Sequence, residues 1–164
     1  ASPRDPARLC ALLASIGVVA RCRAGRPGAA GWCEDAASAL VSFSVRLGPG
    51  RWVEEPGRVL RAVARFSAEA LLPADVPRAQ DPARLALLHV ARLLLRRTRG
   101  RRPPRGSVSL RLCACPSVSV MPLFGLFLRH FPGLTVHVDL AAPAPPEPAS
   151  GGPCGRGGGY ERVT

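Results

Sequence analysis

The sequence predicts an α/β domain in which helices cover a mixed β-sheet, and two patterns lead to this prediction. Residues 39–47 alternate apolar and polar side chains, and a Gly-Pro-Gly turn and a short partner strand at residues 51–55 follow, as in a β-hairpin. Residues 107–140 read as a strand, an apolar helix and a second strand, a unit whose crossover makes its two strands parallel. An antiparallel hairpin beside a parallel strand–helix–strand unit gives a mixed sheet.

The N-terminal segment predicts a helix over residues 5–16. Its apolar residues recur at the i, i+3, i+4, i+7 spacing of one helix face. Asp5 as N-cap and Pro6 at the first helical position fit its start. Residues 17–31, rich in Gly, Arg and Pro, are predicted to lack regular structure.

The hairpin consists of a half-buried strand over residues 39–47, a turn at residues 48–50 and a short partner strand at residues 51–55. Two helices follow. The first covers residues 58–72, and the second covers residues 82–98 with Asp81 as N-cap.

A basic loop at residues 99–106 leads into the parallel unit. It comprises a strand at residues 107–114, a helix at residues 117–130 that Pro122 interrupts early, and a strand at residues 134–140.

The chain of 164 residues has the length of one domain of ordinary size. We expect residues 1–140 to form the folded domain. Residues 141–164 are rich in Pro and Gly and poor in apolar residues, and we expect them to form a disordered tail.

The formal net charge is +12, and all 23 basic residues are arginine. A charge of this sign and size favours nucleic acid or another anionic partner. GC-rich codons, which encode Arg, Ala, Gly and Pro, are an equally good explanation of the total. No apolar run is long enough to cross a bilayer, so no membrane association is predicted. The compartment is left open, with the nucleus or cytoplasm favoured.

The six cysteines (10, 22, 33, 113, 115 and 154) are scattered, and we interpret most of them as reduced thiols. Cys113 and Cys115 alternate along a strand, so they point to opposite faces and do not pair readily with each other. Buried strand-end thiols are favoured over metal ligands for both.

Two stretches, RFSAEALL at residues 65–72 and SLRLCACPSVSVMPLFGLFLRHFPGLTVHVDL at residues 109–140, give the chain a family resemblance. Together with the order of elements, they resemble the cytidine deaminase superfamily, and within it the AID/APOBEC-like polynucleotide branch. That family places a His-x-Glu sequence at one helix start and Pro-Cys-x-x-Cys at a strand-to-helix corner, where three ligands hold Zn²⁺ and the Glu moves protons.

The resemblance implies that this chain has lost its metal centre. It places the three ligand positions at Ser67, Ser117 and Val120, and it retains the proton-shuttling Glu as Glu69. Hydroxyl and isopropyl groups do not replace the thiolates and imidazole that zinc requires. No cofactor is therefore expected, with zinc as the alternative, and Glu69 is interpreted as vestigial.

The same residues have structural explanations. An N-cap role accounts for Ser67 and Ser117 without chemistry, and a helix dipole favours a carboxylate at Glu69. The family continues past residue 140 with a further strand, so the resemblance implies a fold truncated at its C-terminal end, with a bare sheet edge.

The strongest local charge signal is RRTRGRRPPR at residues 96–105. Guanidinium groups suit phosphate oxygens, so the cluster predicts nucleic-acid binding; a solvated loop is the alternative. The candidate residues are Arg96, Arg97, Arg99, Arg101, Arg102 and Arg105.

We therefore expect a catalytically inactive deaminase-like domain. It would bind RNA or single-stranded DNA through residues 96–105, or a protein partner at the exposed sheet edge. The alternative is an active zinc-dependent polynucleotide cytidine deaminase that edits C to U. A third hypothesis, a chain without a selected fold, predicts that unfolding is not cooperative.

Overall fold

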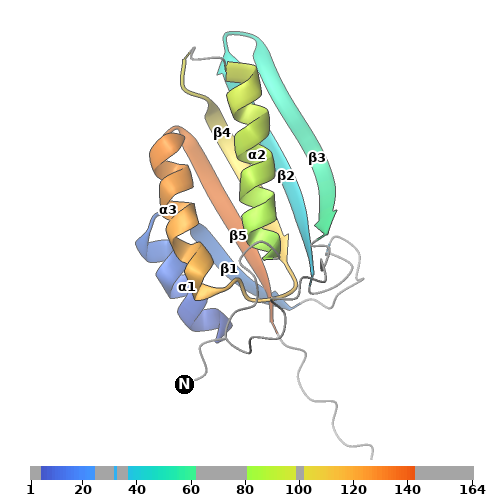
Figure 1. The fold of residues 1–164 in the computed structure, drawn as a ribbon, viewed down its shortest axis with the longest axis vertical. Helices are drawn as coiled ribbons and strands as arrows, with labels where there is room; N and C mark the ends of the chain where they lie inside the picture. The colour runs from blue at the N-terminus through green and yellow to red at the C-terminus, as the bar shows by residue number, and fades with distance from the viewer. Residues whose placement is uncertain (1–4, 25–31, 33–36, 62–80, 99–101, 143–164) are drawn as a thin grey trace, which may run out of the picture.

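The computed structural model describes residues 5–24, 32, 37–61, 81–98 and 102–142. The described part of the chain begins with a helix and a strand, continues with a hairpin, and ends with two helices that alternate with two strands (Figure 1). The elements are α1 (Pro6–Ser15), β1 (Val19–Ala24), β2 (Ser38–Gly48), β3 (Arg51–Arg61), α2 (Pro82–Thr98), β4 (Arg105–Leu112), the 3-10 turn η3 (Val118–Val120), α3 (Met121–His130) and β5 (Leu134–Ala142).

An open five-stranded sheet in the order β1-β5-β4-β2-β3 forms the centre of the fold. β2 pairs antiparallel with both β3 and β4, whereas β4, β5 and β1 pair in parallel. The predicted hairpin and the predicted parallel unit are both confirmed, and β2 and β4 join them. The prediction of a mixed α/β fold is therefore confirmed.

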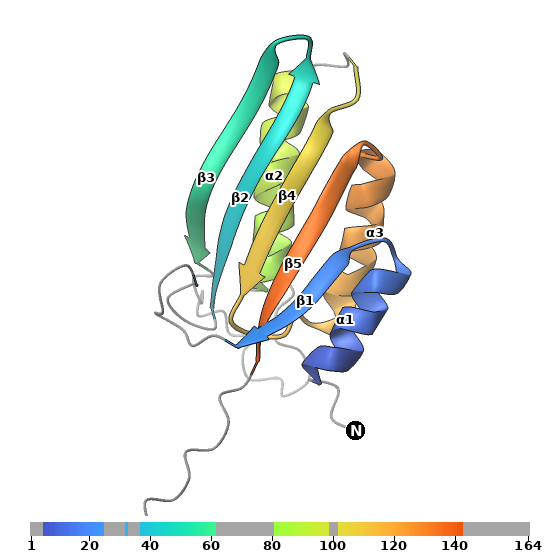
Figure 2. The ribbon, with the colours of Figure 1, turned by 180° about the vertical axis from the view of Figure 1, so that it is seen from behind.

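The hydrophobic core lies between the sheet and the helices. Figures 1 and 2 show α2 and α3 lying across one side of the sheet, and α1 packs beside α3 against β1 and β5. Alternate residues of the central strands point into this core, as expected for strands buried on one face. The core residues of β2, β4 and β5 are Ala39, Val41, Phe43, Val45, Leu47, Val108, Leu110, Leu112, Leu134, Val136, Val138 and Leu140, all buried.

The opposite side of the sheet is polar, and no helix of the described residues covers it (Figure 2). Its side chains are half-buried or exposed, in contrast to the buried residues that alternate with them. We call this side the polar face. Its central members are Ser42, Ser44 and Arg46 of β2, Arg105, Ser107 and Ser109 of β4, and Thr135 and His137 of β5.

Both predicted Asp-Pro helix starts are confirmed. Asp5 Oδ1 accepts the backbone N–H of Ala7 at 3.0 Å at the start of α1. Asp81 Oδ1 accepts the N–H of Ala83 at 2.9 Å at the start of α2. In each case the following proline has no N–H to satisfy and a φ already suited to a helix.

The prediction that residues 17–31 lack regular structure is wrong for Val19–Ala24, which form β1. The alternation of arginine with small residues over residues 20–23 is a short strand pattern, and pairing with β5 completes it. β1 pairs with β5 from Val19↔His137 to Ala24↔Ala142. The implied bare edge at β5 is therefore wrong, and the two sheet edges are β1 and β3.

The predicted helix at residues 58–72 is wrong for its first residues, because β3 continues to Arg61. Val59 pairs with Leu40, and Leu60 pairs with Ala39, so sheet pairing overrides the local helical spacing. The rest of that segment lies outside the described residues. β4 ends at Leu112, two residues before the predicted end of its strand.

At the other end of the chain, β5 extends to Ala142, two residues past the predicted domain end, and residues 143–164 lie outside the described part. Cys113 is disulfide-bonded, which corrects its interpretation as a reduced thiol, whereas Cys10 and Cys22 are free thiols. Among the helices that the structure describes, none has both the length and the apolar character needed to cross a membrane.

Candidate nucleic-acid-binding surface

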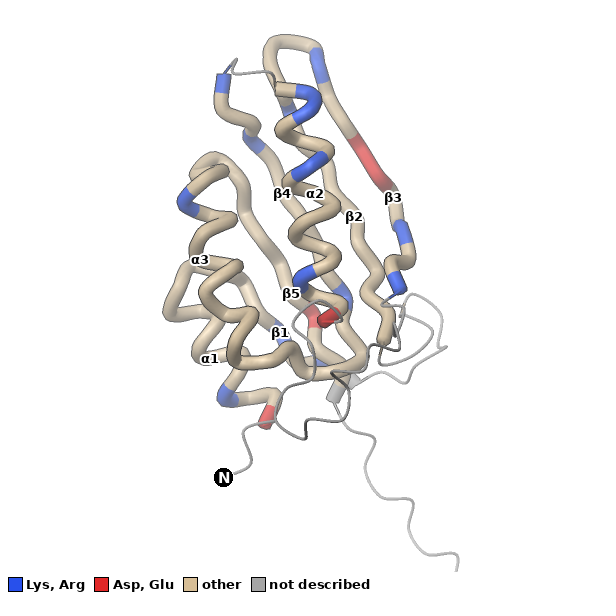
Figure 3. Tube along the Cα trace, in the orientation of Figure 1, with Lys and Arg blue, Asp and Glu red and all other residues tan. Residues whose placement is uncertain are grey.

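Arginines gather at the end of the molecule where α2 ends, β2 turns into β3, and β4 begins (Figure 3). We call this the arginine-rich end. The structure places four members of the predicted cluster there and adds two arginines of the hairpin; Arg99 and Arg101 lie outside the described residues. The described members are Arg46, Arg51, Arg96, Arg97, Arg102 and Arg105, all exposed.

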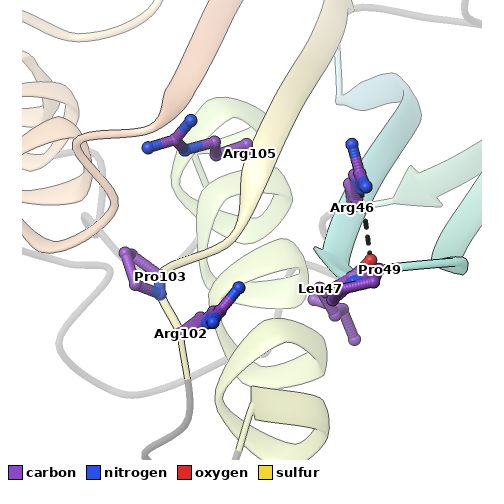
Figure 4. Close-up of a pocket in the computed structure, with 7 residues that line it drawn as sticks. Arg46, Leu47, Pro49, Arg102, Pro103 and Arg105 are labelled. Carbon is purple, nitrogen blue, oxygen red and sulfur yellow. Dashed lines mark hydrogen bonds between the residues drawn. The ribbon is translucent and has the colours of Figure 1, made fainter.

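An open cavity of about 310 Å³ lies within the arginine-rich end. Figure 4 shows its two walls, one from the end of β2 and its turn, the other from the segment that leads into β4. Arg102 extends into the gap between the walls, whereas the guanidinium of Arg105 points away from Arg46. The lining residues are Arg46, Leu47, Gly48, Pro49, Arg102, Pro103 and Arg105, none of them acidic.

The cavity arginines are not neutralised by described carboxylates. Arg46 Nε donates to the carbonyl of Gly48 at 3.2 Å, which fixes the direction of its side chain. In the described part of the chain, Arg46, Arg102 and Arg105 form no ion pair with a carboxylate. Unpaired guanidinium groups around a cavity without acidic residues create a positive potential that favours an anion.

The described carboxylates of the sheet are engaged elsewhere. Asp139 contacts Arg23 at 3.5 Å and Arg111 at 3.9 Å. Glu55 Oε2 lies 3.3 Å from His89 Nε2, and its Oε1 lies 3.8 Å from Arg58. Glu54 of β3 lies next to Trp52 along the polar face, where its Oε1 accepts a hydrogen bond from Ser44 Oγ at 3.2 Å. None of these described carboxylates forms an ion pair with Arg46, Arg102 or Arg105.

Two glycines allow β4 to enter the sheet close to its neighbours. Gly106 has φ +150° and donates its N–H to the carbonyl of Gly133 at 3.2 Å. A Cβ at Gly106 would collide with the carbonyl oxygen of Ser44, and one at Gly133 would lie 2.5 Å from the carbonyl oxygen of Pro104. The backbone at these glycines therefore sets the position of Arg105 beside β2.

The strand register places an aromatic side chain beside the cavity. Arg46 of β2 is opposite Arg105 of β4 on one side and opposite Trp52 of β3 on the other. Directly paired residues share a face of the sheet, so these three lie in one row on the polar face. The indole is 57% exposed, whereas the other described Trp and Phe side chains are half-buried or buried.

The start of α2 and the corner between β4 and α3 meet at the opposite end of the molecule. Asp81 Oδ2 accepts the N–H of Ser117 at 2.8 Å, while its other oxygen caps α2. Ser117 caps η3, since its Oγ accepts the N–H of Ser119 at 3.3 Å. The structural explanation of Ser117 as an N-cap is thus observed directly.

Two of the three positions that the resemblance assigns to zinc ligands, Ser117 and Val120, lie at this corner. Ser117 is exposed, and Val120 is fully buried in the core. Ser67 and Glu69 lie outside the described residues. Within the described ranges, no group of three or more His, Cys, Asp or Glu side chains is arranged to hold a metal ion.

Comparisons with protein-family models, with curated proteins and with solved structures give no match for this chain.

Sequence reasoning missed Arg46 and Trp52 as members of the candidate surface. Both were assigned to hairpin strands, where arginine and tryptophan on an outward face are unremarkable. The outward position of Arg46 follows from the alternation of residues 39–47, but its neighbours follow only from the register. Pairing of β2 with β4 rather than with β5 is what brings the hairpin beside the basic loop.

Proposed function

We propose that this chain is a catalytically inactive, deaminase-like domain that binds nucleic acid through its arginine-rich end. The observation that supports this most directly is the cavity lined by Arg46, Arg102 and Arg105 with no acidic residue in its lining. Guanidinium groups bind phosphate oxygens in a fork geometry, and phosphate contacts supply most of the non-specific affinity for nucleic acid.

The deaminase resemblance gains support from the arrangement of the second half of the chain. A hairpin, a helix, a strand, a corner and a helix are followed by a parallel strand, and the start of α2 contacts that corner. The helix that reaches the corner begins at Asp81, not within residues 58–72. β1, which lies between α1 and the hairpin, departs from the element order that the resemblance implies.

The residues at the corner do not fit a zinc centre, and this supports the absence of catalysis. Zinc takes thiolate, imidazole or carboxylate donors in a tetrahedral set. The Asp81 oxygens both accept backbone N–H groups, Ser117 offers a neutral hydroxyl, and Val120 offers no donor. The described residues at this corner therefore do not form a tetrahedral zinc site.

The active-deaminase alternative makes a separate prediction. Zinc content of the purified full chain is measured together with C-to-U conversion of a single-stranded oligonucleotide. We expect neither stoichiometric zinc nor deamination. Bound zinc accompanied by a deaminase activity that Glu69→Ala removes would overturn the inactive assignment.

A protein partner at a sheet edge is less well supported than nucleic acid. The edge strand β3 contains Pro56, which has no N–H to donate, and its pairing with β2 is shifted between Val41 and Phe43. The other edge, β1, is short and carries Arg21 and Arg23. Prolines, bulges, short strands and charges are features that prevent edge-to-edge pairing.

Binding is tested with a fluorescein-labelled single-stranded oligonucleotide over a range of salt concentrations. The triple variant Arg46→Gln/Arg102→Gln/Arg105→Gln should lose at least about tenfold in affinity at physiological salt. Its slope of log K against log salt should fall by about 2, since each phosphate contact on a single strand contributes about 0.7.

The matched control removes the same charge elsewhere, as Arg8→Gln/Arg84→Gln/Arg129→Gln. We expect this control to retain most of the affinity and the salt slope, because its arginines lie outside the arginine-rich end. Equal losses in the two triple variants would show that net charge alone determines binding, and would overturn the proposed site.

A further inference from the structure

The row formed by Trp52, Arg46 and Arg105 combines an exposed ring with cationic side chains on adjacent strands. Neighbouring strands lie about 4.8 Å apart, so the backbone positions of Trp52 and Arg105 are separated by about 10 Å. A nucleotide with its base on the ring and its phosphate at the cavity spans a distance of this order. Indole rings bind unpaired bases by stacking, and this binding tolerates any base because every base has a π-face.

The surroundings of Trp52 leave its ring accessible. It lies on the edge strand β3, directly after the turn, so one of its flanks has no neighbouring strand. The next residue pair along the polar face is Ser44 and Glu54, whose side chains bond at 3.2 Å from Ser44 Oγ to Glu54 Oε1. The Glu54 carboxylate repels phosphate from that side, whereas the cavity arginines attract it on the other.

We propose that Trp52 stacks against an unpaired base of a single-stranded nucleic acid whose neighbouring phosphates bind at the cavity lined by Arg46, Arg102 and Arg105. This inference rests on the proposed function, and it specifies the form of nucleic acid. A base in a duplex is already stacked and paired, so its π-face is not available to an indole on the protein surface. The arginine-rich end, together with Trp52, therefore selects single-stranded nucleic acid over duplexes.

In this arrangement the bound single-stranded nucleic acid follows a defined path across the sheet. Repulsion by Glu54 disfavours a path along β3, and attraction by the cavity favours a path from β3 across the end of β2 toward β4. The arginines determine that an anion binds, and Trp52 determines that the anion must have bases. These two contributions are separable by probes that have phosphates without bases.

The experiment compares wild type, Trp52→Ala and Trp52→Phe with three probes: a single-stranded oligonucleotide, its duplex, and inorganic polyphosphate. Trp52→Ala should weaken single-strand binding by between about fivefold and 150-fold, the range for loss of one stacked base. Trp52→Phe retains a ring and should restore most of that loss. Polyphosphate affinity should be the same for all three proteins.

Tryptophan emission provides a second readout. Binding of the single strand should quench the emission of wild type, and Trp52→Phe should abolish that change. Because Trp52 is 57% exposed, its replacement should change the stability of the fold only as much as an ordinary surface substitution does. The urea midpoint of every variant is measured to check this.

The outcomes distinguish this inference from the proposed function. If Trp52→Ala binds the single strand as wild type does, while the triple arginine variant is weakened, stacking is refuted and the anion site stands. Equal losses for polyphosphate and for the oligonucleotide in Trp52→Ala also refute stacking. If the triple arginine variant binds every probe as the charge-matched control does, the proposed function itself fails. A protein that binds the duplex as tightly as the single strand contradicts selection for unpaired bases.

Discussion

The Asp81 carboxylate accepts the backbone N–H of Ser117 at 2.8 Å and so fastens the start of α2 to the corner between β4 and α3. Its second oxygen accepts the N–H of Ala83 at 2.9 Å, and the residue is only 8% exposed. One side chain therefore satisfies two donors that belong to elements far apart in the sequence. This hydrogen bond closes the corner between β4 and α3 against the start of α2.

Two replacements of Asp81 should distinguish how much each of its two hydrogen bonds contributes to stability. Asp81→Ala removes both acceptors and should lower the free energy of unfolding by about 2–4 kcal/mol, combining a lost cap and a lost bond to a charged group. Asp81→Ser keeps a capping oxygen and should lose only the part due to Ser117. Urea denaturation measures both. An unfolding midpoint of Asp81→Ser equal to that of wild type would mean that the Ser117 bond contributes nothing, and equal midpoints for the two variants would mean that the cap contributes nothing.

Glycine at position 106 is required by the close approach of β4 to β2. Gly106→Ala places a Cβ against the carbonyl oxygen of Ser44 at a φ of +150°, so the strand must move. We expect a loss of about 3 kcal/mol or more, in the range of the most damaging single substitutions. It should also weaken oligonucleotide binding, because Arg105 is the preceding residue.

Gly125→Ala is the matched control for that change. Position 125 lies within α3, and a Cβ there meets nothing within 4 Å. Alanine is favoured over glycine inside a helix by about 1 kcal/mol, so this variant should be as stable as wild type or more so. Thermal unfolding of both proteins provides the comparison, and a destabilised Gly125→Ala would contradict the packing of α3.

The packing of α1 is tested by two leucines that are adjacent in the sequence. Leu13 is fully buried in the core, whereas Leu12 is 42% exposed. Leu13→Ala should destabilise the fold by about 2–5 kcal/mol, and Leu12→Ala should change stability by about 0.5 kcal/mol or less. Chemical denaturation with two-state analysis gives both values. Similar effects for the two would show that α1 is not part of the core.

The thiol of Cys10 should respond to pH differently in the folded and unfolded chain. Burial, followed by the nearby Cys22 and Cys115, raises the pKa of Cys10 above its ordinary value of 9.0. The folded state therefore holds this proton more tightly than the unfolded state. The contribution to stability is complete below pH 9.0 and is lost as the pH rises from there through the folded pKa.

Thiol alkylation measures this effect directly. Between pH 8 and 10, Cys10 of the folded protein should react more slowly than the same residue in urea, with mass spectrometry identifying the modified site. Cys115→Ser removes one of the neighbours that raise the pKa and should bring the alkylation profile toward lower pH. An unchanged profile in that variant would show that Cys115 contributes nothing and would leave burial and Cys22 as the causes.

The parts of the fold that were predicted correctly depend on local patterns. Asp5-Pro6 and Asp81-Pro82 mark helix starts by chemistry confined to a few residues. The hairpin is indicated by alternation over residues 39–47 followed by a turn, and the parallel unit by apolar segments of suitable length.

The parts that were missed depend on pairing between distant segments. Residues 58–61 have helical spacing, yet they extend β3 because Leu60 pairs with Ala39. β1 is too short to be recognised alone, and its partner β5 is at the other end of the chain. Likewise, the charge cluster at residues 96–105 was visible in the sequence, but the register that adds Arg46 and Trp52 was not.

The pairing of β1 with β5 also has a consequence for how the polypeptide folds during synthesis. β1 is synthesised before the hairpin, α2, β4 and α3, and its partner β5 is the last described strand. β1 cannot form its pairing with β5, and its backbone donors and acceptors stay hydrated, until almost all of the described domain has emerged. Long-range parallel pairing of this kind is slow to form and exposed to misassembly. Arg21 and Arg23 keep β1 soluble while it is unpaired and disfavour its pairing with another nascent chain.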